Sequence, residues 1–527
     1  AALQSIEAAH SLGFQTRTLE LRRAECLDQL GRDNARDVAL SAAEQLQPST
    51  RLDYFLLAEY ERKAGRLDNA VAAYRQALRR DADDFWSMHF LGICLYQQKE
   101  AVGAVSHLTA CVAYRPDFVW SYLARALAFA ELDDFDSAYA DLAVAEQLEP
   151  DLYAIGVNRG GLLLKQNRLK EAVEQFERSA QLDDSRYEPW LNLGIARREM
   201  AVAASTRGAP PEETSAIYRA AAQALEQAVQ RGGGSRVFRV LGDVLRRTGS
   251  AQLALQQYSL AASQERDPKL QADDVRQAGS IFLAAERLEE ALKQYRMALD
   301  LDPDNGDLQR LYAETLIRAG QFQDAIVPLT RALELSGPNA DVYRARGSVL
   351  ARLGRYREAM DDYTLSLELE ADAPNILSRR GWAYILHGND LALSDFRRAV
   401  ELNPESADSH NGLGYALVLA GKVDEAVVSA RTAVRKAEPQ LAAQGSIAWP
   451  LLYNAATVLA QASARASETD AEKYSTEAVE LLRRVIGIAG EVLEPVVRGN
   501  IGTDKALDPI RTREAFKKAF PADDETR

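Results

Sequence analysis

The feature that most constrains this chain is a helical unit that occurs twice between Phe85 and Pro150, with no insertion or deletion. Apolar residues three and four positions apart form one stripe on each of two helices. Small residues at positions 8, 20 and 27 let the two helices approach closely, and a proline at position 32 ends the second helix. The chain is therefore predicted to consist of paired helices. The marked positions are Met88, Leu91, Gly92, Leu95, Ala104, Leu108, Cys111 and Pro116, and then Tyr122, Arg125, Ala126, Phe129, Ala138, Leu142, Ala145 and Pro150.

This spacing and pattern resemble the tetratricopeptide repeat (TPR), a helix–turn–helix unit of about 34 residues. The resemblance implies an all-α fold, a right-handed superhelical solenoid of about 13 repeats with a C-terminal capping helix. Alternating apolar runs joined by Asn-Gly or Asp-Gly turns, which would indicate β-hairpins, are missing from the sequence.

The repeat pattern divides the chain into five segments. Residues 201–215 interrupt one unit and are interpreted as a longer loop or a helix extension. Pro439 closes the unit at 407–439, and a disordered tail is expected from Asp523. Because the chain begins with alanine and already reads as a second helix, we expect a piece of a longer protein. The segments are 1–16 (the second helix of a preceding repeat), 17–200 (N-terminal units), 201–234 (the insertion and the second helix of the interrupted unit), 235–490 (C-terminal units) and 491–527 (cap and tail).

Charge and composition exclude some function classes. The net charge is −14 over 527 residues, which argues against a nucleic-acid partner. There is no apolar run of about 18 residues, so no membrane span is expected. A cytoplasmic location is expected, with the periplasm left open. Cys94 and Cys111 occupy core positions of their repeats, and Cys26 has no partner at a framework spacing.

No constellation of catalytic or metal-binding residues is found. The five histidines, at 10, 89, 107, 387 and 410, show no metal-ligand spacing. Three carboxylate pairs at turns are interpreted as caps of helix N-termini. We therefore expect no enzyme activity and no cofactor or metal. The pairs are Asp83–Asp84, Asp133–Asp134 and Asp183–Asp184.

Several stretches also resemble the C-terminal repeat region of bacterial multidomain Ser/Thr protein kinases. The most telling are LLYNAATVLAQA at 451–462 and LDPIRTREAF at 507–516, and others lie at 83–96, 108–128 and 378–386. The resemblance implies that a kinase domain precedes an array of this kind. The Gly-rich loop, His-Arg-Asp and Asp-Phe-Gly motifs of a kinase are themselves absent from the sequence.

In the TPR family, the first helix of each unit lines a concave groove, and two zones of candidate binding residues fall on those helices. The first zone is apolar, and either packing between repeats or a partner pocket would explain it. Its residues are Trp86, Ile93, Tyr96, Trp120, Leu123 and Leu127.

The second zone is a series of arginines at position 5 of four successive units. Their guanidinium groups suit a carboxylate or phosphate ligand. The alternative is pairing within each helix, since Asp273, Asp307 and Asp341 each precede an arginine by three residues. In the first of the four units, Asp243 is the only acidic groove partner expected. The arginines are Arg239, Arg276, Arg310 and Arg344.

The sequence as a whole favours a non-catalytic scaffold that binds an extended or helical segment of a protein partner. One alternative is a substrate-recruiting or regulatory region of a Ser/Thr kinase. A second is a self-assembling structural array.

Overall fold

The computed structural model describes residues 2–388 and 391–521 of the chain, and these residues form helices and connecting turns without a strand. Consecutive helices pair into thirteen antiparallel hairpins, preceded by a single helix and followed by a cap. The predicted all-α array of about 13 units is therefore confirmed. The tail predicted from Asp523 lies outside the described residues.

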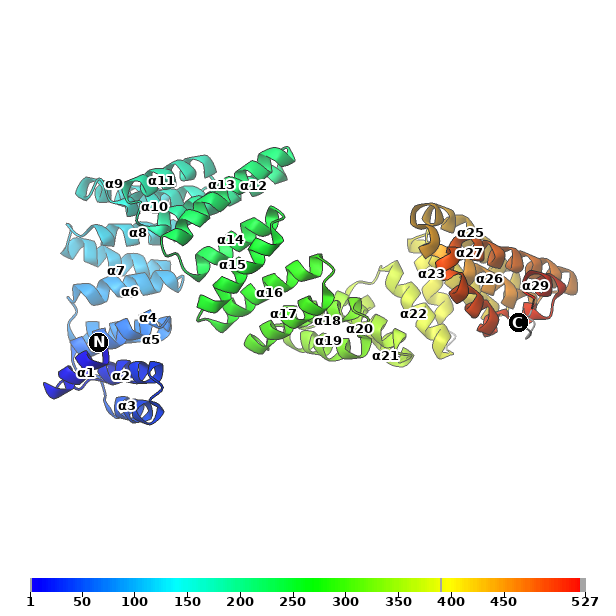
Figure 1. Cartoon of the computed structure of the whole chain (residues 1–527), viewed down its shortest axis with the longest axis horizontal. Coiled ribbons are helices and arrows are strands. Elements are labelled where there is room, and N and C mark those ends of the chain that lie inside the picture. Colours follow the sequence, from blue (N-terminus) through cyan, green and yellow to red (C-terminus); the bar gives the residue numbers. More distant parts are fainter. Residues whose placement is uncertain (1, 389–390, 522–527) are drawn as a thin grey trace. The chain divides into compact units, whose positions relative to one another are not determined.

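The chain divides into two compact units, Ala1–Glu265 and Arg266–Arg527. In the first unit, helix α1 precedes seven hairpins, shown from blue to green in Figure 1. The helices are α1 (Ala2–Ser11), α2 (Arg17–Gln29), α3 (Asp33–Gln45), α4 (Arg51–Lys63), α5 (Leu67–Arg80), α6 (Phe85–Gln97), α7 (Ala101–Tyr114), α8 (Val119–Glu131), α9 (Phe135–Leu148), α10 (Tyr153–Lys165), α11 (Leu169–Leu182), α12 (Tyr187–Thr206), α13 (Pro211–Gln230), α14 (Ser235–Arg247) and α15 (Ala251–Gln264).

The second unit holds six hairpins and the C-terminal cap. Its α-helices are α16 (Pro268–Ala284), α17 (Leu288–Leu301), α18 (Gly306–Arg318), α19 (Phe322–Ser336), α20 (Ala340–Arg352), α21 (Tyr356–Leu369), α22 (Pro374–His387), α23 (Ala392–Leu402), α24 (Ala407–Leu419), α25 (Val423–Gln444), α26 (Trp449–Ser463), α27 (Glu468–Thr503), α28 (Asp508–Arg511) and α29 (Glu514–Ala519). Two short 3₁₀ helices, η1 (Gly445–Ala448) and η2 (Lys505–Leu507), connect the last elements.

In several hairpins a small residue of the first helix faces a large side chain of the second helix. A Cβ at Gly92 would lie 2.7 Å from Cγ of Leu108, and a Cβ at Gly160 would lie 2.5 Å from the ring of Phe176. Both large side chains are fully buried. The small residue is therefore required by the close approach of the helices, as the repeat pattern predicts.

Partly buried arginines connect neighbouring hairpins. Arg346 on α20 donates to both carboxylate oxygens of Asp362 on α21, at 2.9 and 2.7 Å, and to the hydroxyl of Thr330 on α19 at 3.0 Å. Each arginine thus links its own second helix to the second helix of the preceding hairpin. The same arrangement occurs three times, as Arg125 with Asp141 and Thr109, Arg346 with Asp362 and Thr330, and Arg380 with Asp395 and Thr364.

The interrupted unit is extended by helix and not by a loop. Helices α12 and α13 each span 20 residues, whereas the neighbouring α10 and α11 span 13 and 14. Only residues 207–210 connect the two long helices. Residues 201–215 therefore lengthen both helices of one hairpin.

Two local predictions were wrong. Pro439 does not close its unit, because α25 continues through it to Gln444. Asp183 does not cap the N-terminus of α12, since it follows α11 and accepts hydrogen bonds from the backbone and hydroxyl of Ser185. By contrast, Asp84 and Asp134 do accept from backbone amides in the first turns of α6 and α9.

The cap follows a break in α27 at Gly490, whose backbone is in the left-handed region with φ of 66°. Beyond it, Arg511 donates to the carbonyl oxygens of Ile501 and Asp504, at 3.1 and 2.9 Å. Leu507, Ile510 and Phe516 are buried. The segment LDPIRTREAF thus seals the apolar end of the second unit.

The first helices form the inner layer of each unit. Helix α8 contacts both α6 and α10, and in the second unit α20 contacts both α18 and α22. No two second helices in the described chain approach each other as extensively. The first helices of consecutive hairpins therefore lie side by side within each unit.

Candidate functional site: an apolar cavity and a basic cavity

The first candidate site is an apolar cavity of about 310 Å³ lined by the consecutive first helices α6, α8 and α10. Five of the six residues predicted for the apolar zone line it together. This volume is at the lower end of the about 300–1,000 Å³ typical of ligand pockets. The five residues are Ile93 and Tyr96 from α6 and Trp120, Leu123 and Leu127 from α8.

The five side chains differ in exposure. Leu123 is 3% exposed, so it packs between the helices and forms the floor of the cavity. Trp120 remains 44% exposed although it is the largest side chain of the group. Ile93, Tyr96 and Leu127 are half-buried. Packing explains Leu123, whereas it leaves much of Trp120 uncovered.

Trp86, the sixth predicted residue, does not line the cavity. Its ring lies against an aromatic cluster, with the ring centroid of Phe118 at 5.5 Å and that of Phe90 at 6.1 Å. It is nevertheless 42% exposed. Trp86 and Trp120 therefore have nearly equal exposure but different surroundings.

Polar groups occur at defined points of the cavity. His89 is 4% exposed, and its Nδ1 lies 3.2 Å from the hydroxyl oxygen of Ser121. Burial lowers the pKa of His89 to about 4, so the imidazole is neutral at pH 7. Asn158 on α10 donates from Nδ2 to the carbonyl oxygen of Leu123 at 3.2 Å. The cavity thus carries no formal charge at neutral pH.

The arginines of the predicted basic zone lie on their expected helices and are paired. Arg239, in the first unit, contacts Glu265 at 2.9 Å, which is a different acid from Asp243, the only acidic groove partner predicted for the arginines of this helix. Arg276 on α16 contacts Asp273 at 2.5 Å. The intrahelical pairing considered from the sequence therefore forms on α16.

Arg310 and Arg344 lie on adjacent first helices and line one cavity of about 630 Å³. Arg310 contacts Glu314 at 2.6 Å, whereas Asp307 is 3.9 Å away. Arg344 pairs with Asp341. Two further arginines also line the cavity, Arg318 and Arg352, at the C-terminal ends of the two helices.

Some residues of both cavities were not found from the sequence. His89, Gln97 and Asn158 line the apolar cavity, and Arg318 and Arg352 line the basic one. The two arginines are one repeat length apart in the chain, as are Arg310 and Arg344. That spacing was the signal that could have identified them.

Neither a metal-binding cluster nor a membrane-spanning helix is found among the described residues. No group of three or more histidine, cysteine, aspartate or glutamate side chains there could hold a metal ion. Among the same residues, no helix combines the length and the apolar character needed to cross a membrane.

These features define a class: an α-helical solenoid whose inner layer offers an apolar and a basic cavity. Three family models, all described as "Tetratricopeptide repeat", match the chain. One matches residues 55–117, 218–270 and 383–442, another 282–349 and the third 340–372. The chain is therefore a TPR protein. Among curated proteins, none matches the chain.

Several solved structures resemble parts of the chain. YrrB, described as a TPR protein with an unusual peptide-binding site, is 22% identical, with 36% of this chain and 96% of YrrB covered and a TM-score of 0.33. The C-terminal part of a TPR protein from Cytophaga hutchinsonii is 17% identical, with coverage of 49% and 99% and a TM-score of 0.41. Yeast Tom70 is 15% identical, with coverage of 86% and 99% and a TM-score of 0.31.

Proposed function

We propose that this protein is an interaction scaffold and that the apolar cavity on α6, α8 and α10 binds apolar side chains of an extended or helical partner segment. The observation that carries the proposal is the cavity itself, about 310 Å³ in volume and lined by five apolar or aromatic residues of the predicted zone. A large side chain such as Trp120, 44% exposed at the mouth of a cavity, is typical of an interface anchor.

The chemistry of the cavity limits its ligand. Burying a charged group there is unfavourable, because His89 is neutral and no ionised side chain lines the walls. Apolar surface removed from water contributes about 25 cal/mol per Å². The partner segment is therefore one that presents leucine, isoleucine, phenylalanine or methionine, with polar groups at its margin for Gln97 and Asn158.

The experiment is a selection of displayed random peptides on the full chain, followed by a second round on Trp120→Ala and on Trp86→Ala. The expected peptides carry apolar residues at spacings of three or four, retain binding to Trp86→Ala and lose it on Trp120→Ala. Trp86 is the matched control because it is similarly exposed but lies outside the cavity. Peptides that bind both variants as well as the unmodified chain would refute the proposal.

We also propose, from the sequence resemblance, that the array serves a Ser/Thr protein kinase as a recruiting or regulatory region. The segments at 451–462 and 507–516 support this proposal. Determining the coding sequence upstream of residue 1 tests it. A Gly-rich loop, a His-Arg-Asp loop and an Asp-Phe-Gly triplet are expected there, and an upstream region without them would refute the kinase association.

A further inference from the structure

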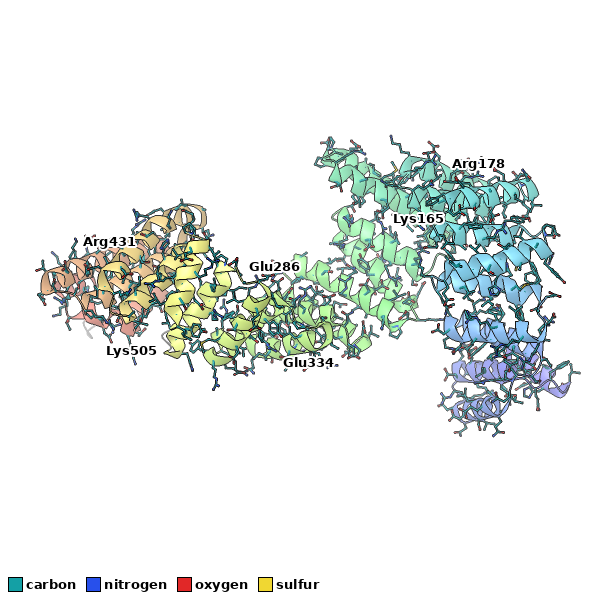
Figure 2. The ribbon with its side chains drawn as sticks, turned by 180° about the vertical axis from the view of Figure 1, so that it is seen from behind. Lys165, Arg178, Glu286, Glu334, Arg431 and Lys505 are labelled. Atoms are coloured by element: carbon teal, nitrogen blue, oxygen red, sulfur yellow. The ribbon has the colours of Figure 1, made fainter. Side chains whose placement is uncertain are left out.

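In the basic cavity on α18 and α20, the arginines of α20 lack the glutamate partners that pair with the equivalent arginines of α18. On α18, Arg310 is held by Glu314 at 2.6 Å, and Arg318 is held at 2.6 Å by Glu286, which is labelled in Figure 2. Both arginines have counterparts one repeat length later, Arg344 and Arg352. The first pair of arginines is thus neutralised by carboxylates of the chain itself.

The counterparts of the two glutamates are not acidic. One repeat length after Glu314 the chain has Ser348, and at the same distance after Glu286 it has Gly320. Arg344 therefore keeps only Asp341. Arg352 lies over the ring of Phe322, with its guanidinium carbon 5.1 Å from the ring centroid, and no carboxylate among the described residues is within ion-pair distance.

A third arginine extends the unneutralised charge along the inner layer. Arg379 on α22 is exposed, and its Nη1 is 3.5 Å from the hydroxyl oxygen of Ser348 on the cavity wall. Ser348 also lies 3.3 Å from the phenol oxygen of Tyr363. Asp408 lies farther from Arg379 than ion-pair distance, and burial raises the pKa of this carboxyl. Three arginines on two adjacent first helices thus share one carboxylate at contact distance.

We propose that this surface, defined by Arg344, Ser348, Arg352 and Arg379, binds an acidic peptide segment through its carboxylates. Carboxylates are favoured over a phosphate because the equivalent arginines Arg310 and Arg318 already bind carboxylates. Asp307, Glu314 and Asp341 also line the cavity and would repel a doubly charged phosphate more strongly. This site lies in the second compact unit and does not depend on the apolar cavity of the first.

The net negative charge of the protein opposes nonspecific binding of an acidic peptide. At a net charge of −14, the chain as a whole repels an acidic peptide, so binding requires a local site. Arginine–carboxylate contacts at an exposed site are screened by salt, with a Debye length of about 10 Å at 0.1 M. Binding should therefore weaken as the ionic strength rises.

The test uses a fluorescein-labelled hexaglutamate peptide, read by fluorescence polarisation with the full chain at low ionic strength. Binding is expected, and Arg352→Gln together with Arg379→Gln should raise Kd about tenfold. Arg398→Gln is the control, because it removes the same kind of charge from α23, where Arg398 pairs with Asp372 and Glu401. The control should leave Kd within about twofold.

A second variant restores the missing acid. Ser348→Glu places a carboxylate four residues after Arg344, as Glu314 stands to Arg310, and is expected to raise the Kd for hexaglutamate. Circular dichroism checks that each variant keeps its helix content. Absence of hexaglutamate binding, an equal effect of Arg398→Gln, or binding of a phosphoserine peptide but not of hexaglutamate would each overturn the proposal.

Discussion

The pair Arg346–Asp362 should be one of the strongest polar contacts in the second unit. The carboxylate side chain is 4% exposed and the guanidinium side chain 20% exposed, and two hydrogen bonds of 2.9 and 2.7 Å join them. Breaking a buried ion pair by removing one partner costs about 3–5 kcal/mol. Because Arg346 is partly exposed and keeps its hydrogen bond to Thr330, we expect Asp362→Asn to lower the free energy of unfolding by about 2–3 kcal/mol.

A double-mutant cycle isolates the interaction. Arg346→Met, Asp362→Asn and the double variant should give a coupling free energy of about 2 kcal/mol. The matched control is the exposed pair Arg355–Glu358, with side chains 40% and 54% exposed, for which a much smaller coupling free energy is expected because solvent and salt screen the charges. The two cycles compare a buried pair between helices with an exposed pair close together in sequence.

The assay must respect the repeat architecture. An array of hairpins does not unfold in two states, so a single midpoint for the full chain averages over its parts. Hydrogen exchange at increasing urea concentrations, resolved to peptides of α20 and α21, measures the local free energy of opening. Equal coupling energies for Arg346–Asp362 and Arg355–Glu358 would refute the reasoning.

Two further predictions concern the first unit. Gly160→Ala should destabilise the first unit by about 1–3 kcal/mol, because the new Cβ would lie 2.5 Å from the ring of Phe176. Gly161→Ala in the same helix meets no atom within 4 Å and should stabilise the unit by about 0.5–1 kcal/mol. Local hydrogen exchange compares the two variants, and effects of equal sign would contradict the packing. The pKa of His89 is about 4 in the folded state and 6.5 in the unfolded state, so the unfolded state binds the proton more tightly. The contribution of the neutral histidine to stability is therefore fully present above pH 6.5. It should be lost as the pH falls from 6.5 through 4. Relative to His89→Gln, the unmodified protein should lose up to about 3 kcal/mol over that range in urea titrations at stepped pH, and parallel pH profiles would contradict it.

The regular spacing of the repeat made most of the fold predictable. Gly92 and Leu108 face each other across a single hairpin, so their contact is local in sequence and falls at a fixed place in the repeat. The prediction at Pro439 was wrong because a proline was interpreted as the end of a helix, whereas α25 continues through it. The prediction at Asp183 was wrong because the side chain of an aspartate before a helix can instead accept hydrogen bonds from nearby turn residues.

The sites were less predictable than the fold. Sequence positions identified which side chains lie on first helices, but not that Trp86 joins an aromatic cluster while Trp120 lines a cavity. The charge balance around Arg344 and Arg352 depends on contacts between different helices, such as Glu286 with Arg318. A pattern read along one helix does not contain those contacts.

The partly buried arginine–aspartate pairs follow a recurring spacing in the sequence. Arg125–Asp141 and Arg346–Asp362 have the same separation in sequence, from a first helix to the second helix of the same hairpin. An arginine and an aspartate recurring at that separation indicate a contact across the hairpin.

The most direct test of the scaffold proposal is the affinity of a selected apolar peptide for the Trp120→Ala and Trp86→Ala variants, measured on the full chain by fluorescence polarisation. Truncating an anchor residue of an interface costs about 2 kcal/mol or more. Trp120→Ala is therefore expected to raise Kd about 30-fold, whereas Trp86→Ala should change it by less than about threefold. Equal effects of the two substitutions, or none from Trp120→Ala, would contradict binding in the cavity on α6, α8 and α10.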